Sequence, residues 1–195
     1  MSQAVVLARG PGIEHFDPKE WLGAETFGVN DVSRFHRVSR LVTVDDPWLI
    51  TRESNPDMTD EAWQRIQYTK TCNPFRWYMP GEKAKSHPIH KKWCYVPIEL
   101  VAYQDWEYGN ISILPQSIMS VFTATALALA YGYKQVVVFG VHVYGHPAHE
   151  PRMAEILDAW SWLEDQARNN NQSIFIGHEG SALNEVLPLY KEQIA

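Results

Sequence analysis

The sequence predicts one α/β domain with a Rossmann-like parallel sheet flanked by helices. Short apolar segments recur along the chain and alternate with helical patterns, which is the order of elements that a parallel sheet requires. Several of these segments run directly into glycine or polar residues, as strands do when their carboxyl ends form a ligand site. The chain has 195 residues, of which 45% are hydrophobic, and this length suits a single core. We therefore interpret residues 1–195 as one domain.

Three strands are predicted in the first quarter of the chain. Residues 4–8 form a short apolar strand that leads into Gly10-Pro11-Gly12, a loop in which the backbone can approach a ligand closely. Residues 26–29 and 41–44 are the next two apolar segments, and both end in polar residues. Strands at this spacing favour a parallel arrangement.

A helix is predicted between the first two of these strands. Asp17 is suited to the N-cap position and Pro18 to the first helical position, and Gly23 is a typical stop signal. This helix completes the first strand–helix–strand unit.

The middle of the chain, residues 47–112, is interpreted as an insertion or lid within the domain. It is irregular and rich in Pro, Trp, Lys and His. One helix is predicted over residues 60–68, with Thr59 as its N-cap, and residues 96–103 are a further candidate strand.

Regular alternation returns in the last part of the chain. Residues 117–131 are apolar on nearly all sides, which predicts a buried helix. Residues 135–139 are a continuous β-branched and aromatic segment, typical of a strand that is covered on both faces. An amphipathic helix is predicted for residues 152–169, a last strand for 173–176, and a last helix from Ser181 onward.

Polar residues follow five of the predicted strands. Because the carboxyl ends of parallel strands meet at one edge of the sheet, we expect several of these segments to converge. They are Arg9-Gly10-Pro11-Gly12, Asn30-Asp31, Asp45-Asp46, residues 140–149 and residues 177–179. This convergence is the main argument for a ligand site.

The segment 140–149 holds His142, His146 and His149. A neutral imidazole near pH 7 can act as a general base, and three imidazoles at this spacing can also bind a metal ion. A polar surface loop is the third interpretation. Asp45-Asp46 has two interpretations as well, a turn before proline or a site for a divalent ion.

Composition limits the classes of partner. The formal net charge is −6 and the charges are interspersed, so nucleic acid is a disfavoured partner. No segment reaches the roughly 18 continuous apolar residues of a membrane span, and the first residues lack the features of a signal peptide. Two cysteines with no metal-binding spacing favour a reducing, cytoplasmic location. No feature predicts an oligomeric state.

Two parts of the sequence resemble a known superfamily. The first consists of residues 5–13, followed by residues 27–30 and Asp45, and the second consists of residues 120–134 and 136–144. These segments are similar to the single-domain Rossmann-like bacterial sialyltransferases and to their distant relatives, the archaeal 6-hydroxymethylpterin diphosphokinases. That superfamily opens with a strand and a G-x-G-P-S loop, and later has a Ser-led, Ala-rich helix ending in G-Y-K before a strand and G-[IV]-D.

The resemblance implies a set of nucleotide-binding residues. They are Arg9, Gly10, Gly12, Asn30, Ser120 and Gly140. The first three meet donor phosphate or ribose, the next two contact the nucleotide, and the last lets it pack close to the sheet. The chain departs from the pattern at Arg9, where the sialyltransferases have Asn, at Gly12, where they have Ser, and at His142, where they have Asp.

These observations lead to a functional hypothesis with two alternatives. The first is a nucleotide-dependent transferase, a glycosyltransferase with a nucleotide-sugar donor and a catalytic base from His142, His146 or His149. It needs no cofactor besides that donor and no metal ion. The alternatives are a pyrophosphate-transferring kinase, with magnesium at Asp45 or Asp46, and a non-catalytic protein that binds or sequesters a nucleotide. A short, divergent member of this kind fits a phage or mobile-element protein.

Overall fold

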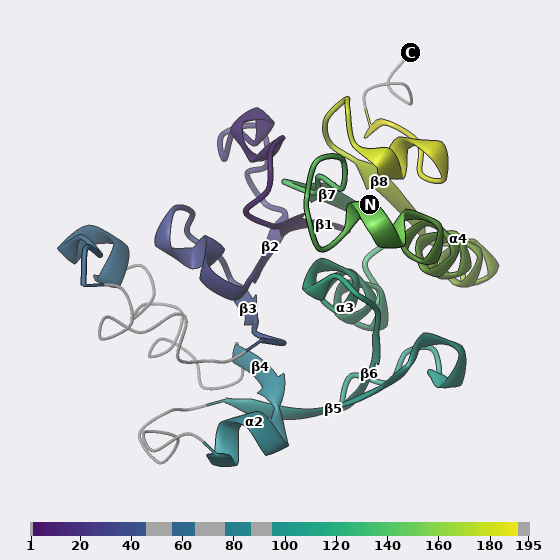
Figure 1. Cartoon of the computed structure of the whole chain (residues 1–195), viewed down its shortest axis with the longest axis horizontal. Helices are drawn as coiled ribbons and strands as arrows, with labels where there is room; N and C mark the ends of the chain where they lie inside the picture. The colour runs from purple at the N-terminus through teal and green to yellow at the C-terminus, as the bar shows by residue number, and fades with distance from the viewer. Residues whose placement is uncertain (1, 46–55, 65–76, 87–94, 191–195) are drawn as a thin grey trace.

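The computed structural model describes residues 2–45, 56–64, 77–86 and 95–190 of the chain. Within these ranges, eight strands form one curled sheet in the order β6-β5-β4-β3-β2-β1-β7-β8 (Figure 1). Every neighbouring pair of these strands is parallel. The predicted class, an α/β fold with a Rossmann-like parallel sheet flanked by helices, is confirmed.

The described strands are short, and six of the eight lie where the sequence predicts them. The strands are β1 (Gln3–Leu7), β2 (Glu25–Val29), β3 (Arg40–Val42), β4 (Trp77–Pro80), β5 (Val96–Ala102), β6 (Ile113–Gln116), β7 (Gln135–Phe139) and β8 (Ser173–Ile176). The α-helices are α2 (Gly81–Ser86), α3 (Ser120–Ala130) and α4 (Met153–Asn169). The predictions for α3 and α4 are confirmed to within three residues at each end.

The order in which strands are added to the sheet changes direction at β1. From β1 the chain moves outward through β2 to β6, and it then returns to place β7 on the other side of β1. This is a topological switch point, where the loops after β1 and β7 diverge and leave a crevice at the carboxyl edge.

The main core lies on the concave face of the sheet. The sheet curls around α3, and α4 packs beside it (Figure 1). Nine of the 11 residues of α3 are buried, which explains why its sequence is apolar on nearly all sides. Alternate strand residues serve the two faces, so Val6 packs toward α3 while Val5 and Leu7 pack on the opposite face.

The helix predicted from Asp17 to Gly23 is not formed. The segment is a series of turns, in which the Asp17 carboxylate accepts a hydrogen bond from the Lys19 N–H at 2.9 Å. Pro18 and Gly23 leave too few residues between them for a stable helix. Instead, Trp21 is buried against the ring of Phe139, with ring centroids 5.7 Å apart.

The final helix is shorter than predicted. It is a single 3₁₀ turn, Ala182–Glu185. Ser181 caps it, since the Ser181 hydroxyl accepts from the Leu183 N–H while the Asn184 side chain accepts from the Ser181 N–H. The predicted start is therefore confirmed, but the predicted length is wrong.

Part of the middle segment belongs to the sheet. The strand β5 was predicted within residues 96–103, whereas β4 was not predicted and lies between β3 and β5. Residues 60–64 are helical and Thr59 caps them, with its hydroxyl accepting from the Ala62 N–H at 3.2 Å. Residues 65–68 of that predicted helix lie outside the described residues. A role as a lid stays a prediction.

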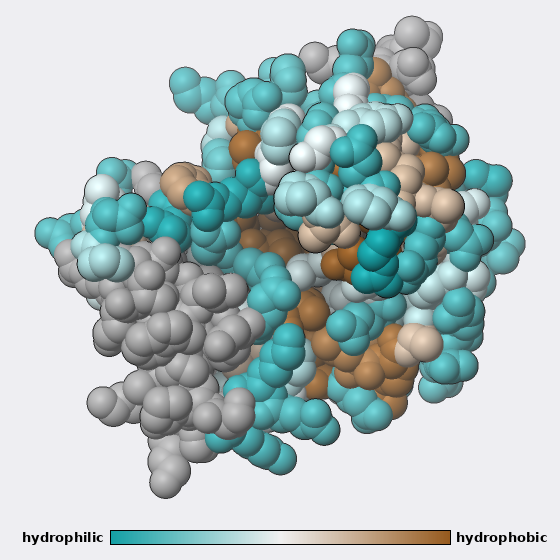
Figure 2. All heavy atoms as spheres, in the orientation of Figure 1, coloured by the Kyte–Doolittle hydropathy of each residue, from teal (hydrophilic) through white to brown (hydrophobic). Residues whose placement is uncertain are grey.

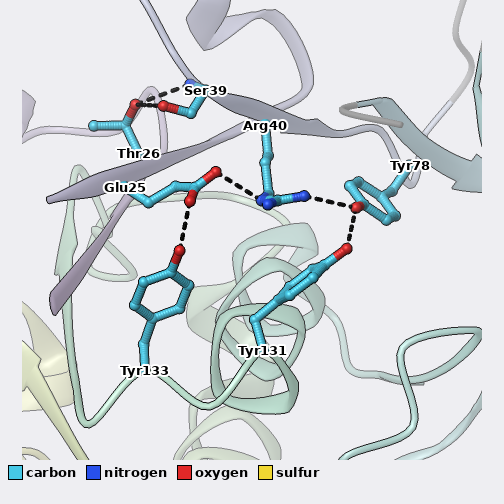
Figure 3. Close-up of polar contacts among 7 residues, drawn as sticks. All are labelled: Glu25, Thr26, Ser39, Arg40, Tyr78, Tyr131 and Tyr133. Atoms are coloured by element: carbon cyan, nitrogen blue, oxygen red, sulfur yellow. Dashed lines mark hydrogen bonds and ion pairs between the residues drawn. The ribbon is translucent and has the colours of Figure 1, made fainter. Parts of the chain in front are cut away.

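The amino edge of the sheet carries a polar network centred on Arg40 (Figure 3). Arg40, the first residue of β3, forms an ion pair with Glu25 at 2.8 Å and donates to the Tyr78 hydroxyl at 2.9 Å. Its guanidinium lies 4.2 Å from the ring centroid of Tyr131, whose hydroxyl bonds to that of Tyr78. The Tyr133 hydroxyl donates to Glu25, and burial and this bond raise the pKa of Tyr133 to about 12.

None of the described helices is both long enough and apolar enough to cross a lipid bilayer.

Candidate nucleotide-binding cleft

A cleft of about 380 Å³ lies at the carboxyl edge of the sheet, at the switch point. In Figure 2, apolar side chains are visible at the floor of a hollow near the centre of the molecule, between polar surroundings. The loops after β1, β2, β3 and β7 and the start of α3 supply its lining. Eight of the nine candidate residues named from the sequence line it: Arg9, Gly10, Asn30, Ser120, Gly140, His142, His146 and His149.

The two loops at the switch point are in direct backbone contact. The Ala8 N–H donates to the Phe139 carbonyl at 2.9 Å, and the Gly10 N–H donates to the Gly140 carbonyl at 2.8 Å. A Cβ atom on Gly140, whose φ is 73°, would lie 2.1 Å from the Ala8 oxygen. A Cβ atom on Gly10 would lie 2.5 Å from the Gly140 oxygen. Only glycine fits at either position.

Asn30, Asp45 and Ser120 form a triangle of hydrogen bonds across the cleft. The Asn30 amide donates to the Asp45 carboxylate and to Ser120 Oγ, the latter at 3.4 Å. Ser120 Oγ donates to Asp45 at 3.2 Å. The side-chain amide oxygen of Asn30, Oδ1, is buried and has no hydrogen-bond partner among the described residues. It is an acceptor that a bound ligand can satisfy.

The start of α3 opens into the same cleft. Met119, Ser120 and Val121 line it, and no side chain caps this helix terminus. The first N–H groups of a helix lack partners within the helix and carry a partial positive charge. An 11-residue helix placed in this way favours an anionic group in the cleft.

Arg9 lies at the rim of the cleft. Its guanidinium pairs with Asp31, and it also lies 5.2 Å from the ring centroid of Phe35. The Arg9 side chain is 59% exposed, so this ion pair contributes little to stability. The cation is therefore held beside the cleft while staying accessible to a ligand.

The loop of residues 140–149, called the histidine loop below, also lines the cleft, through Gly140, His142, His146 and His149. The rings of His146 and His149 are stacked, with centroids 3.9 Å apart. Burial, and then the charge of His146, lower the pKa of His149 below the ordinary histidine value. The Nδ1 atom of His149 is buried without a partner among the described residues. A histidine with a lowered pKa is neutral at pH 7, the form that accepts a proton.

Two contacts that the sequence did not indicate hold this loop. The Tyr144 hydroxyl donates to Glu185 at 2.9 Å, and the Gly145 N–H donates to Glu150 at 3.0 Å. The first joins residues 41 positions apart in the sequence, so no local pattern signals it, whereas the second lies within the loop.

Gly12 does not line the cleft. It packs against His178, because a Cβ atom on Gly12, whose φ is 94°, would lie 2.2 Å from the His178 ring. The His178 ring bonds to the Glu179 carbonyl at 3.0 Å. Segment 177–179 therefore supports the glycine loop from outside the cleft. Asp46 lies outside the described residues, and no group of three or more His, Cys, Asp or Glu residues suited to a metal ion occurs within them.

Comparison with known proteins identifies the fold but no close relative. No protein-family profile matches the chain, and no curated protein matches its sequence. The fold is similar to that of the sialyltransferase CstII from Campylobacter jejuni in complex with a substrate analogue, CMP-3FNeuAc, with a TM-score of 0.50 and 14% identity. That match covers 97% of this chain and 85% of the other.

Two further structures of that enzyme give the same result. One is its complex with cytidine-5'-monophosphate, with a TM-score of 0.52, 13% identity, and coverage of 97% of this chain and 85% of the other. The other is a single-site mutant of the α-2,3/8-sialyltransferase CstII, with a TM-score of 0.53, 13% identity, and coverage of 96% and 86%. At this level of identity, the likeness establishes a sialyltransferase-like fold.

Proposed function

We propose that the protein is a nucleotide-dependent transferase, and specifically a glycosyltransferase that uses a nucleotide-sugar donor. One observation carries the proposal. Gly10 and Gly140, the hydrogen-bonded triangle, the open terminus of α3 and the stacked pair His146 and His149 all line one cleft at the switch point of the sheet. This is where open parallel sheets bind nucleotides.

The cleft offers a distinct group for each part of a nucleotide. The N–H groups at the start of α3 suit a phosphate, and the close backbone approach of Gly10 to Gly140 leaves room for a flat ligand beside the sheet. Asn30 and Ser120 supply hydrogen bonds for ribose or base. Arg9 offsets negative charge that develops on the leaving group.

The histidine pair supplies the base for transfer. The acceptor hydroxyl gives its proton to an imidazole of His146 or His149, and its oxygen forms a bond to the anomeric carbon of the donor sugar. The bond between that carbon and the phosphate oxygen breaks, and the nucleotide leaves with the bonding electrons. The lowered pKa of His149 keeps that ring ready to accept the proton at neutral pH.

The structural neighbours suggest which nucleotide to test first. Their structures include complexes with CMP and with the CMP-linked analogue CMP-3FNeuAc, so a CMP-linked sugar is the proposed donor class. The fold and the cleft support this choice together, since the cleft lies at the crevice where the fold class binds its ligands.

A thermal-shift screen tests the proposal. The panel contains CMP, UMP, UDP, GDP and ATP and their sugar conjugates, each with and without EDTA. We expect CMP and a CMP-sugar to stabilise the protein by about 2.7 kcal/mol at 100 times Kd, a shift of several degrees for a chain of this size. Absence of stabilisation by every nucleotide would refute the proposal. Stabilisation by ATP that EDTA abolishes would favour the kinase alternative.

A further inference from the structure

A second hollow, of about 330 Å³, lies on the face of the sheet opposite α3. We call it the aromatic hollow. Phe139 lines it, whereas the next residue, Gly140, lines the cleft, and the two hollows share no lining residue among those described. The described lining consists of Gln3, His15, Glu20, Trp21, Phe139, Gly177 and Tyr190.

Three aromatic rings form the walls of the aromatic hollow. The Trp21 ring centroid lies 5.7 Å from that of Phe139, with an angle of 79° between the ring planes. It lies 5.1 Å from that of Tyr190, with an angle of 46°. Because the rings are inclined to one another, they line the hollow from several sides. This arrangement resembles the aromatic cages in which proteins bind quaternary ammonium groups.

The walls are held in place without a ligand. The Tyr190 hydroxyl accepts from Gln3 Nε2 at 2.9 Å, and the same Nε2 donates to Gln135 Oε1 at 2.7 Å. The Tyr190 ring also packs edge-on against Phe175, with centroids 5.6 Å apart, and Trp21 is only 9% exposed. A ligand therefore meets rings that are already ordered, which lowers the entropic cost of binding.

The charge of the aromatic hollow favours a cation. Glu20 is the one carboxylate of the described lining, which includes no Lys or Arg. Its side chain is in an exposed residue and forms no ion pair or hydrogen bond within the described part of the chain. The other titratable lining groups are His15 and Tyr190. An unpaired carboxylate beside three aromatic rings attracts a positive group and repels a negative one.

We propose that the aromatic hollow binds a small quaternary ammonium compound. Its methyl groups pack against the rings of Trp21, Phe139 and Tyr190, and its positive charge is attracted by the ring faces and by Glu20. The volume is at the small end of the range for ligand pockets, roughly 300–1,000 Å³, which suits a compound of this size. This site is separate from the cleft, and the proposal does not depend on the transferase function.

An NMR titration with choline tests the site. The reporter is the Trp21 indole N–H resonance of the isotope-labelled protein, identified by its loss in Trp21→Phe. Choline should shift it saturably while the Ser120 amide in the cleft stays in place. Two analogues isolate the charge: neohexyl alcohol, in which carbon replaces the nitrogen, and betaine, in which a carboxylate replaces the hydroxymethyl group. We expect both to bind at least about fivefold more weakly than choline.

Two variants test the walls and the charge separately. Tyr190→Leu and Glu20→Gln should each weaken choline binding about three- to tenfold. Glu107→Gln is the matched control, because Glu107 is an exposed carboxylate outside the aromatic hollow, and it should bind choline like the wild type. Unchanged indole resonances of the other tryptophans show that each variant is folded.

Three results would overturn the proposal. They are the absence of a saturable Trp21 shift at millimolar choline, equal affinity for neohexyl alcohol, and unchanged choline affinity in both Glu20→Gln and Tyr190→Leu. Binding of CMP to the cleft has no bearing on these outcomes, so failure of this proposal and failure of the transferase proposal are distinguishable.

Discussion

The two edges of the sheet both gather polar side chains, but they use them in opposite ways. At the amino edge, Arg40 is paired with Glu25 and Tyr78 and lies against the Tyr131 ring (Figure 3). At the carboxyl edge, polar groups surround a cleft, and two side-chain atoms that belong to its lining residues, Asn30 Oδ1 and His149 Nδ1, are buried without partners among the described residues.

This difference separates a structural network from a binding site. Buried polar groups in folded proteins are normally hydrogen-bonded, so unpaired ones call for an explanation. The amino-edge network holds three strands together, whereas an unpaired polar group beside a cleft costs stability that a ligand can restore. We therefore expect variants of the amino edge to change stability, and most variants of the cleft to change ligand binding or turnover.

The largest expected effect is on turnover, at the histidine pair. His149→Ala or His146→Ala, whichever removes the base, should reduce kcat by roughly 10²–10⁴-fold while CMP affinity stays nearly intact. The measurement is steady-state transfer from a CMP-sugar, together with a CMP binding titration. His142→Ala completes the series, because His142 also lines the cleft. Full activity in all three variants would remove the loop from the mechanism.

The pH profile of the wild type sharpens this prediction. A general base must be unprotonated to act, so kcat/KM should rise with pH through the pKa of the base and then level off. Because burial lowers the pKa of His149, the midpoint should lie below the ordinary histidine value of about 6.5. A midpoint above that value would contradict the assignment to His149.

The next effect concerns the backbone contact at the switch point. Gly140 and Gly145 have similar φ angles, 73° and 71°, but a Cβ atom meets the Ala8 oxygen at Gly140 and open space at Gly145. Gly145→Ala should cost roughly 1–2 kcal/mol through backbone strain alone. Gly140→Ala should cost a further ~1–3 kcal/mol because the two loops must move apart, and CMP binding should weaken with it. The measurement is the free energy of unfolding of both variants in urea. Equal losses in Gly140→Ala and Gly145→Ala would show that the two loops are not in tight contact.

At the amino edge, Arg40→Met should lower the free energy of unfolding by roughly 1–3 kcal/mol, because Glu25 and Tyr78 lose their shared partner. CMP affinity of the folded variant should not change. Lys134→Met is the matched control, since Lys134 is an exposed cation at the same edge and surface changes of this kind stay within about 0.5 kcal/mol. A loss of CMP affinity in Arg40→Met would mean that the two edges are coupled.

The smallest expected effects are those of single hydrogen bonds. Asn30→Ala and Ser120→Ala should each weaken CMP binding by about 0.5–1.5 kcal/mol. Thr26→Ala removes a comparable bond at the amino edge, where Thr26 Oγ1 accepts from the Ser39 N–H at 2.9 Å, and it should leave CMP affinity unchanged. Equal CMP affinity in Asn30→Ala, Ser120→Ala and Thr26→Ala would contradict the contrast between the two edges.

The parts of the fold that could be predicted from the sequence are those with a strong local pattern. The strands β7 and β8 were predicted to the residue because their apolar residues are continuous and bounded by turns. The strand β4 was missed, since Trp77–Pro80 ends in proline, which argues against a strand inside a sheet. It is a strand because β3 and β5 lie on either side of it, and no local pattern reports such pairing.

The same distinction applies to the polar residues. Strand ends rich in Gly, Asn, Asp and His were predicted to converge, and the topology brings Gly10, Asn30 and Gly140 together as expected. The Arg40 network was not predicted, because its members come from four separate segments of the chain. The position of Gly12 against His178 was missed for the same reason.

An NMR titration of the isotope-labelled protein with CMP tests the central claim most directly, because it reports on both edges at once. We predict saturable shifts in the amide resonances of Gly10, Ser120 and Gly140, while those of Glu25 and Arg40 stay in place. Shifts centred on the amino edge, or no saturable shift at millimolar CMP, would contradict the assignment of the carboxyl-edge cleft as a nucleotide site.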